Sequence, residues 1–128
     1  MKKLPHTFSG IVFSGILLAG LIITGCTYDK EDVLYPPVAG CDTVVVTYAA
    51  SVAPIMNSSC NVCHSTTVAT AGVITDNYEG LKIIAQDGRL WGTVSHTGAI
   101  KMPKDAPKLS DCNLAKIQKW IDAGYPNN

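Results

Sequence analysis

The sequence predicts an all-α domain, and two stretches carry that prediction. Residues 110–123 place apolar side chains at helical spacing with polar side chains between them, the pattern of an amphipathic helix. Residues 78–86 repeat the pattern in shorter form, between a candidate cap at Asp76 or Asn77 and a stop at Asp87–Gly88. With 128 residues, the chain has the length of one small domain with some terminal sequence outside it.

The first elements of the domain precede residue 76. A β-branched run at residues 43–47 (TVVVT) predicts either a short strand or an extended lead-in. Ser51 is the expected N-cap of a first helix, and Pro54 suits its first turn, where the missing N–H costs little. Residues 65–75 are rich in Thr, Ala and Gly and are expected to form a loop. The first helix carries one apolar stripe: Val52, Ile55 and Met56.

The second half of the domain is predicted to hold two more helices. A short one is expected at residues 89–94, followed by a loop at residues 95–109 that contains two prolines. Ser110 or Asp111 then caps the last helix, and Gly124 fits its C-terminal end. The apolar face of this helix consists of Leu114, Ile117, Trp120 and Ile121.

Five consecutive residues follow the first helix: Cys60-Asn61-Val62-Cys63-His64. The pattern Cys-x-x-Cys-His is the attachment signature of a c-type haem. The two thiols add across the two vinyl groups at one porphyrin edge, and the two residues between them let the backbone bridge that gap. The histidine then lies under the iron as its proximal ligand. The motif therefore predicts one covalent haem c held by Cys60, Cys63 and His64.

Two other kinds of site also use Cys-x-x-Cys. A structural zinc site needs four ligands, usually with a second Cys or His pair at similar spacing. A thioredoxin-like redox pair usually lies between a strand and a helix of a larger α/β domain. Neither context is visible here, so the sequence favours haem attachment. The expected fold is then a set of helices wrapped around the haem, which supplies much of the buried apolar surface of so small a domain.

Residues 1–25 have the features of an export signal. Two lysines precede an apolar run at residues 11–23, which is shorter than the roughly 18 apolar residues of a membrane-spanning helix. The run leads into Thr24-Gly25-Cys26, small residues before a cysteine, and this resembles the signal of a bacterial lipoprotein. Cys26 is thus the predicted lipid site and membrane attachment, where two or three acyl chains would anchor the chain stably. The alternative is an ordinary signal peptide that happens to contain a cysteine.

Residues 26–40 predict a flexible tether between the lipid and a domain at residues 41–128. They carry acids, aromatics and the pair Pro36–Pro37 without a helical or strand period, and the fourteen residues after Cys26 reach on the order of 45 Å when extended. The chain is expected to be exported and lipid-anchored, with its domain facing the periplasm. Lys30-Glu31-Asp32 resembles signals that send some lipoproteins to the cell surface, and an acidic solvated linker is the simpler interpretation of that cluster.

Two of the five cysteines, Cys41 and Cys112, are assigned neither to lipid nor to haem attachment. An exported chain meets an oxidising compartment, which makes this pair a disulfide candidate. A bridge would tie the start of the domain to its last helix. Two free buried thiols, or capture by a partner, are the alternatives, because geometry decides the question and the sequence does not give it.

The charge of the mature chain excludes one class of partner. Removal of residues 1–25 leaves eight Lys and Arg against ten Asp and Glu, a net charge of −2. A nearly neutral domain offers no electrostatic case for nucleic acid.

The haem motif and the C-terminal sequence together resemble a known family. A helix, Cys-x-x-Cys-His, a methionine beside a proline in a loop, and a terminal amphipathic helix are similar to small monohaem cytochromes c. Residues 109–112 (LSDC) and 120–124 (WIDAG) more narrowly resemble lipoprotein cytochromes of Gram-negative bacteria. The resemblance covers residues 26–128. It implies a cytochrome c-like helical domain around one covalent haem, and electron transfer with redox partner proteins.

The sixth iron ligand decides between an electron carrier and an enzyme, because an open site permits binding chemistry. Three candidates exist in the mature chain: Met56, His96 and Met102. Met56 lies in the first helix close before the motif and is expected to pack in the core. Met102 is favoured, because Pro103 stiffens its loop and because cytochromes of this kind place the distal methionine in such a loop. His96 would give a bis-His haem of lower potential and is otherwise a loop imidazole.

The expected activity is therefore electron transfer, with no small-molecule substrate and no enzymatic reaction. Lys101, Lys104 and Lys108 flank the proposed ligand and form either a docking rim for an acidic partner or three solvated lysines. The alternative function is a haem enzyme or sensor with an open or labile sixth position, such as a peroxidase. His96 is the single candidate for the distal acid–base group that a peroxidase needs.

Overall fold

The computed structural model describes residues 40–128. The export signal, the lipid site at Cys26 and all but the last residue of the tether therefore lie outside the described residues. Residues 40–128 contain helices and no strand, which confirms the all-α class. No helix in this part of the chain is long and apolar enough to cross a membrane.

The first helical segment begins earlier than predicted. A π-helical turn, Tyr48–Val52, leads directly into α3, Ala53–Ser59. The cap is Thr47, whose side chain accepts a hydrogen bond from the Ala50 N–H, so the expectation that Ser51 caps this helix is wrong. The β-branched residues before it form no strand: Val44 and Val45 lie in a bend, and Thr47 has an extended backbone. Pro54 does lie in the first turn of α3, where its missing N–H costs little.

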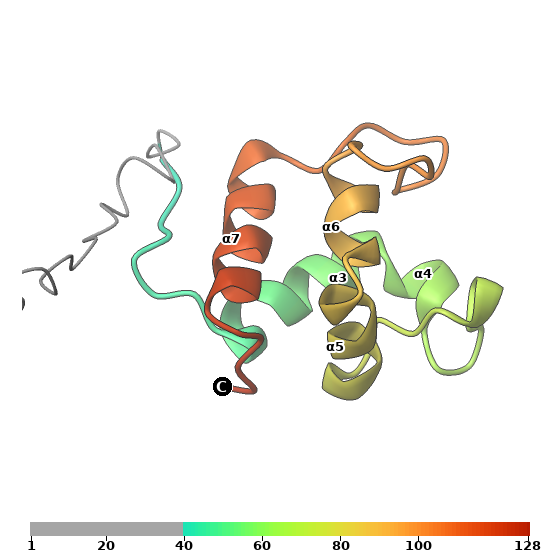
Figure 1. The fold of residues 1–128 in the computed structure, drawn as a ribbon, viewed down its shortest axis with the longest axis horizontal. Helices are drawn as coiled ribbons and strands as arrows, with labels where there is room; N and C mark the ends of the chain where they lie inside the picture. Colours follow the sequence, from blue (N-terminus) through green and yellow to red (C-terminus); the bar gives the residue numbers. More distant parts are fainter. Residues whose placement is uncertain (1–39) are drawn as a thin grey trace, which may run out of the picture. The chain divides into compact units, whose positions relative to one another are not determined.

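The haem motif forms its own short helix. Cys60 ends α3, and α4, Asn61–His64, follows at once. The loop that begins at Ser65 contains one 3-10 turn, Thr70–Gly72. Figure 1 shows α3 running from the α7 side of the domain toward α4 at its other end.

The next two helices have the predicted bounds. The first, α5, spans Tyr78–Gln86, and Asn77 caps it by accepting a hydrogen bond from the Gly80 N–H. The second, α6, spans Arg89–Val94. Gly88 joins them at φ 80°, a left-handed conformation that glycine adopts without strain.

The last helix, α7, spans Asp111–Asp122 and is capped by Ser110, whose hydroxyl accepts from the Asn113 N–H. Gly124 follows its end at φ 82°, as the C-terminal cap requires. In Figure 1, α7 stands beside α6, and the loop between them arches over the side of the domain that holds α4.

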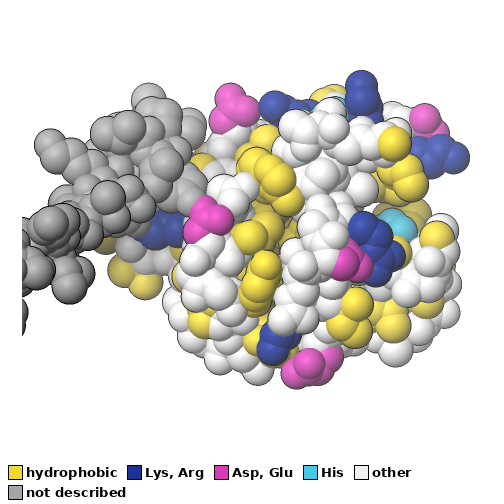
Figure 2. Space-filling view, viewed as in Figure 1, with side chains coloured by type: hydrophobic (Ala, Val, Ile, Leu, Met, Phe, Trp, Pro, Cys, Tyr) yellow, Lys and Arg dark blue, Asp and Glu magenta, His cyan; other side chains and the backbone are white. Residues whose placement is uncertain are grey.

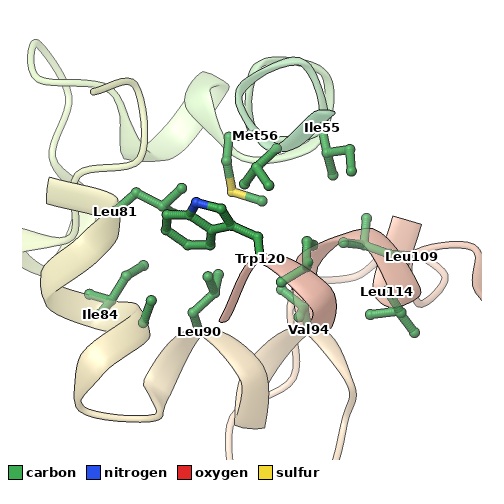
Figure 3. Packing of buried hydrophobic residues seen from close by; sticks show 12 residues of the cluster. Ile55, Met56, Leu81, Ile84, Leu90, Val94, Leu109, Leu114 and Trp120 are labelled. Carbon is green, nitrogen blue, oxygen red and sulfur yellow. The ribbon is translucent and has the colours of Figure 1, made fainter. Parts of the chain in front are cut away.

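The core lies where α3, α5, α6 and α7 meet, and Trp120 lies at its centre (Figure 3). The Met56 side chain points toward the Trp120 ring from α3 and is fully buried, as its position in the first helix predicted. Trp120 also donates from Nε1 to the Pro126 carbonyl at 2.9 Å, which satisfies its one polar atom. The largest fully buried side chains are Trp120, Met56, Leu81, Ile117 and Val52.

A disulfide joins Cys41 to Cys112, with 5.5 Å between the two Cα atoms. It links the lead-in to the first turn of α7. The same region is held from the other end of the chain, because Asn128 accepts hydrogen bonds from the backbone N–H groups of Tyr48 and Ala49, both at 2.9 Å.

Candidate haem-attachment site

The turn around α4 brings Cys60, Cys63 and His64 to the same hollow at the surface. The Cys60 carbonyl accepts from the N–H groups of Cys63 at 3.1 Å and His64 at 3.0 Å, which fixes the turn that carries them. Both cysteines are free thiols, Cys60 half-buried and Cys63 exposed. Burial raises the pKa of Cys60 to about 11, so this thiol stays protonated at neutral pH.

Two neighbouring hollows open beside this turn, with volumes of about 230 and 190 Å³. They share three lining residues, His64, Ala71 and Met102, so they are two parts of one site. The first part is also lined by both motif cysteines, and the second by Arg89. The space-filling view shows a histidine side chain among hydrophobic side chains, next to a basic one (Figure 2).

His64 and Met102 therefore face the same space although 38 positions separate them in the sequence. The other two candidates for a second iron ligand do not. Met56 is 0% exposed within the core, and His96 is absent from the residues that line either hollow. His96 instead points its Nε2 at the Met102 carbonyl oxygen, 3.0 Å away.

The His64 ring carries an unusual atom. Among the buried side-chain nitrogens and oxygens of residues 40–128, only Nδ1 of His64 lacks a hydrogen-bond partner. An unpaired buried polar atom costs free energy of folding. A ring whose Nδ1 is enclosed has only Nε2 to offer to an iron in the hollow.

Thr75 holds the motif turn from the loop side, and sequence reasoning missed it. Its N–H donates to the His64 carbonyl at 2.7 Å, and its hydroxyl donates to Asn61 Oδ1 at 2.8 Å. The side chain is 4% exposed and is the only buried polar one in the described part of the chain. A threonine inside a Thr-rich loop gave no signal of burial, since its neighbours Thr66, Thr67 and Thr70 are exposed.

The loop itself is closed by a second set of hydrogen bonds. Asp76 accepts from both the N–H and the hydroxyl of Thr66, each at 2.7 Å. These bonds stabilise the ionised carboxylate and lower the pKa of Asp76 below its usual 3.8. The start and end of the loop are thus tied together next to His64.

The residues present fit a covalently bound haem. The lining of the hollow includes two thiols, a histidine ring and a thioether. Two large apolar side chains at its margins, Val62 at 84% and Ile100 at 62% exposure, would be covered by a large apolar group. Arg89 stands at the part of the site away from the cysteines, and its Nε pairs with Asp87 at 2.7 Å.

The lysines near Met102 are solvated. Lys101, Lys104 and Lys108 are exposed, and Lys104 lines the hollow beside Pro103. Lys108 also lies 3.8 Å from Asp111, which neutralises part of its charge.

No protein-family model, curated protein or solved structure matches this chain. Within residues 40–128, no group of three or more His, Cys, Asp and Glu side chains could hold a metal ion by itself.

Proposed function

We propose that this protein is a membrane-tethered electron-transfer protein that carries one electron on a single covalent haem c. The observation that carries the proposal is the convergence of the Cys-x-x-Cys-His turn and Met102 on one hollow. A zinc site or a dithiol redox pair gives no reason for a distant methionine to share that space with the histidine of the motif.

Each site residue has one role in this proposal. Cys60 and Cys63 would hold the haem through thioether bonds, and the iron would be bound by His64 through Nε2 and by Met102 through its sulfur. The haem supplies an iron that is stable in both the ferrous and the ferric state. The chain's own task is to hold that iron in one geometry in both states and to keep water away from it.

Ligation by two side chains favours electron transfer over catalysis, because no coordination position is left for a substrate. A neutral thioether favours the ferrous state and so raises the reduction potential relative to a second histidine. Enclosure by apolar side chains acts in the same direction, since the ferric site carries one more positive charge.

The peroxidase or sensor alternative needs an open iron and a distal acid–base group. His96 was the candidate for that group, but its Nε2 contacts the Met102 carbonyl and its side chain lines neither hollow. This arrangement supports a structural task for His96 and an electron-transfer task for the site.

Export, lipid attachment at Cys26 and the tether at residues 26–40 belong to the same proposal. They would let the domain reach redox partner proteins at a membrane surface, where the exposed Lys101 and Lys104, the second of which lines the hollow, could contact an acidic partner. No nucleic acid and no small-molecule substrate are expected.

Covalent attachment is the first test. The chain is produced with a c-type haem maturation system, denatured, and extracted with acidified acetone. The proposal expects the haem to remain on the protein and a double Cys60→Ala, Cys63→Ala variant to lack it. Cys41→Ser is the matched control, because it removes a cysteine outside the motif and should keep the haem. A chromophore that the solvent extracts from the wild type would refute covalent attachment.

A further inference from the structure

We propose that His96 is a positioning residue that holds the backbone of Met102 so that its thioether faces His64, an inference that rests on the proposed function. The contact joins His96 Nε2 to the Met102 carbonyl oxygen at 3.0 Å, and both residues are half-buried. A carbonyl only accepts hydrogen bonds, so Nε2 carries the proton and donates. The imidazole thus acts on the ligand's main chain and leaves the sulfur free.

The second main-chain group of Met102 is also held. Its N–H donates to the Thr93 carbonyl near the end of α6 at 3.1 Å. Both polar groups of the Met102 backbone are therefore bonded, one to a helix and one to the His96 ring. Met102 is fixed by its backbone on two sides, and its side chain is directed from that fixed point.

The loop that carries Met102 is docked on the open end of α6. The last carbonyls of a helix have no partner within the helix, and here the loop supplies partners. Gly98 N–H donates to the Gly92 carbonyl at 2.7 Å, and His96 N–H donates to the Thr93 carbonyl at 3.3 Å. A Cβ at Gly98 would lie 3.0 Å from that Gly92 oxygen, so glycine allows the close approach.

His96 has an unusual backbone conformation, with φ 62°. This left-handed region is uncommon for residues other than glycine and favours Asn, Asp and His among them. The turn at His96 brings its side chain back along the loop to Met102, six residues later. The hydrogen bond from the His96 side chain to the Met102 carbonyl therefore closes the loop between these two residues.

Closure of this loop would favour binding of Met102 to the iron, which a thioether binds only weakly. A loop that is already ordered loses less conformational entropy when its methionine binds, so the bound state is favoured. Removal of one such hydrogen bond is expected to raise the population of the released loop about 5-fold. External ligands that compete for the iron would then bind faster by the same factor.

Two substitutions separate the hydrogen bond from the backbone requirement. His96→Asn keeps a residue that tolerates the left-handed conformation but is too short to reach the Met102 carbonyl. His96→Gln keeps an amide N–H donor at a reach similar to that of Nε2 but tolerates the backbone conformation less well. If the hydrogen bond matters, His96→Asn releases the loop more than His96→Gln does. If only the left-handed backbone matters, His96→Gln releases it more.

The experiment uses the haem-loaded wild type and both variants. It measures the rate of imidazole binding to the ferric protein, the near-infrared Met-to-iron band, and unfolding by urea. The positioning role predicts imidazole binding about 5-fold faster in His96→Asn and close to the wild-type rate in His96→Gln. It also predicts that His96→Asn weakens the near-infrared band.

The inference can be overturned in two ways: the imidazole rates can remove the positioning role of His96, or the near-infrared band can remove Met102 as ligand. Equal imidazole rates in the wild type and His96→Asn, or a faster rate in His96→Gln than in His96→Asn, would remove the positioning role and leave Met102 as ligand. A wild type without the near-infrared band would remove Met102 ligation, and the inference with it. Urea unfolding separates a local release of the loop from a general loss of stability.

Discussion

The Thr75 N–H donates a hydrogen bond of 2.7 Å to the carbonyl of His64, and the Thr75 hydroxyl donates to Asn61 at 2.8 Å. A single loop residue thus holds the first and last residues of α4. Because α4 carries the proposed proximal ligand and one attachment cysteine, the geometry of the site depends on a contact outside the motif.

Thr75→Val tests this contact. Valine has nearly the same shape but no hydroxyl, so Asn61 Oδ1 loses its donor in a partly buried place. The free energy of unfolding of the haem-loaded protein should fall by about 1 to 3 kcal/mol, measured in urea. Thr75→Ser keeps the hydroxyl and should lose less. A larger loss in Thr75→Ser than in Thr75→Val would assign the effect to packing of the methyl group instead of the hydroxyl.

The stabilisation of the loop by Asp76 is expected to depend on pH. Its folded-state pKa lies below the usual 3.8, because Thr66 donates two hydrogen bonds to the ionised form. The stabilisation is therefore complete above the unfolded pKa and is lost as the pH falls through the lower folded pKa. Wild type should be more stable than Asp76→Asn at neutral pH, and the difference should shrink at about pH 3. A difference that is the same at both pH values would exclude the carboxylate as its source.

The Cys41–Cys112 disulfide should contribute to stability because its cysteines are 71 positions apart. The chain-entropy model gives about 4 kcal/mol for a loop of this length, as an upper estimate. Cys41→Ser should lower the midpoint of urea unfolding, and a reducing agent should then have no further effect. An unchanged midpoint in Cys41→Ser would contradict the predicted contribution.

The helices that could be predicted from the sequence are those with local signals at both ends. Tyr78–Gln86 has a capping Asn77 and a following Asp87–Gly88, and Asp111–Asp122 has Ser110 and Gly124. The period of the apolar residues also predicted the buried face of the last helix: Leu114, Ile117 and Trp120 are buried, and Ile121 is half-buried.

The start of the first helix could not be predicted because distant residues determine it. The backbone N–H groups of Tyr48 and Ala49 donate to Asn128, 80 and 79 positions away. With these groups satisfied from the other end of the chain, Thr47 becomes the cap and Ser51 lies inside the helical segment. A local pattern around Ser51 contains no information about that contact.

The candidate site likewise contains residues that the sequence predicted and residues that only the structure reveals. The attachment residues Cys60, Cys63 and His64 could be named from one five-residue motif. The support around them, from Thr75 and His96, depends on loops that fold back on helix ends, and no sequence period marks such contacts.

The proposed function depends above all on the ligation of iron by Met102, which can be measured on the haem-loaded protein. The near-infrared band of the ferric form and carbon monoxide binding by the ferrous form are compared in the wild type, Met102→Ala and Met56→Leu. If Met102 binds the iron, the wild type and Met56→Leu show the band and do not bind carbon monoxide, while Met102→Ala loses the band and binds it. Ready binding of carbon monoxide by the wild type would refute ligation by Met102, because the iron would then be open.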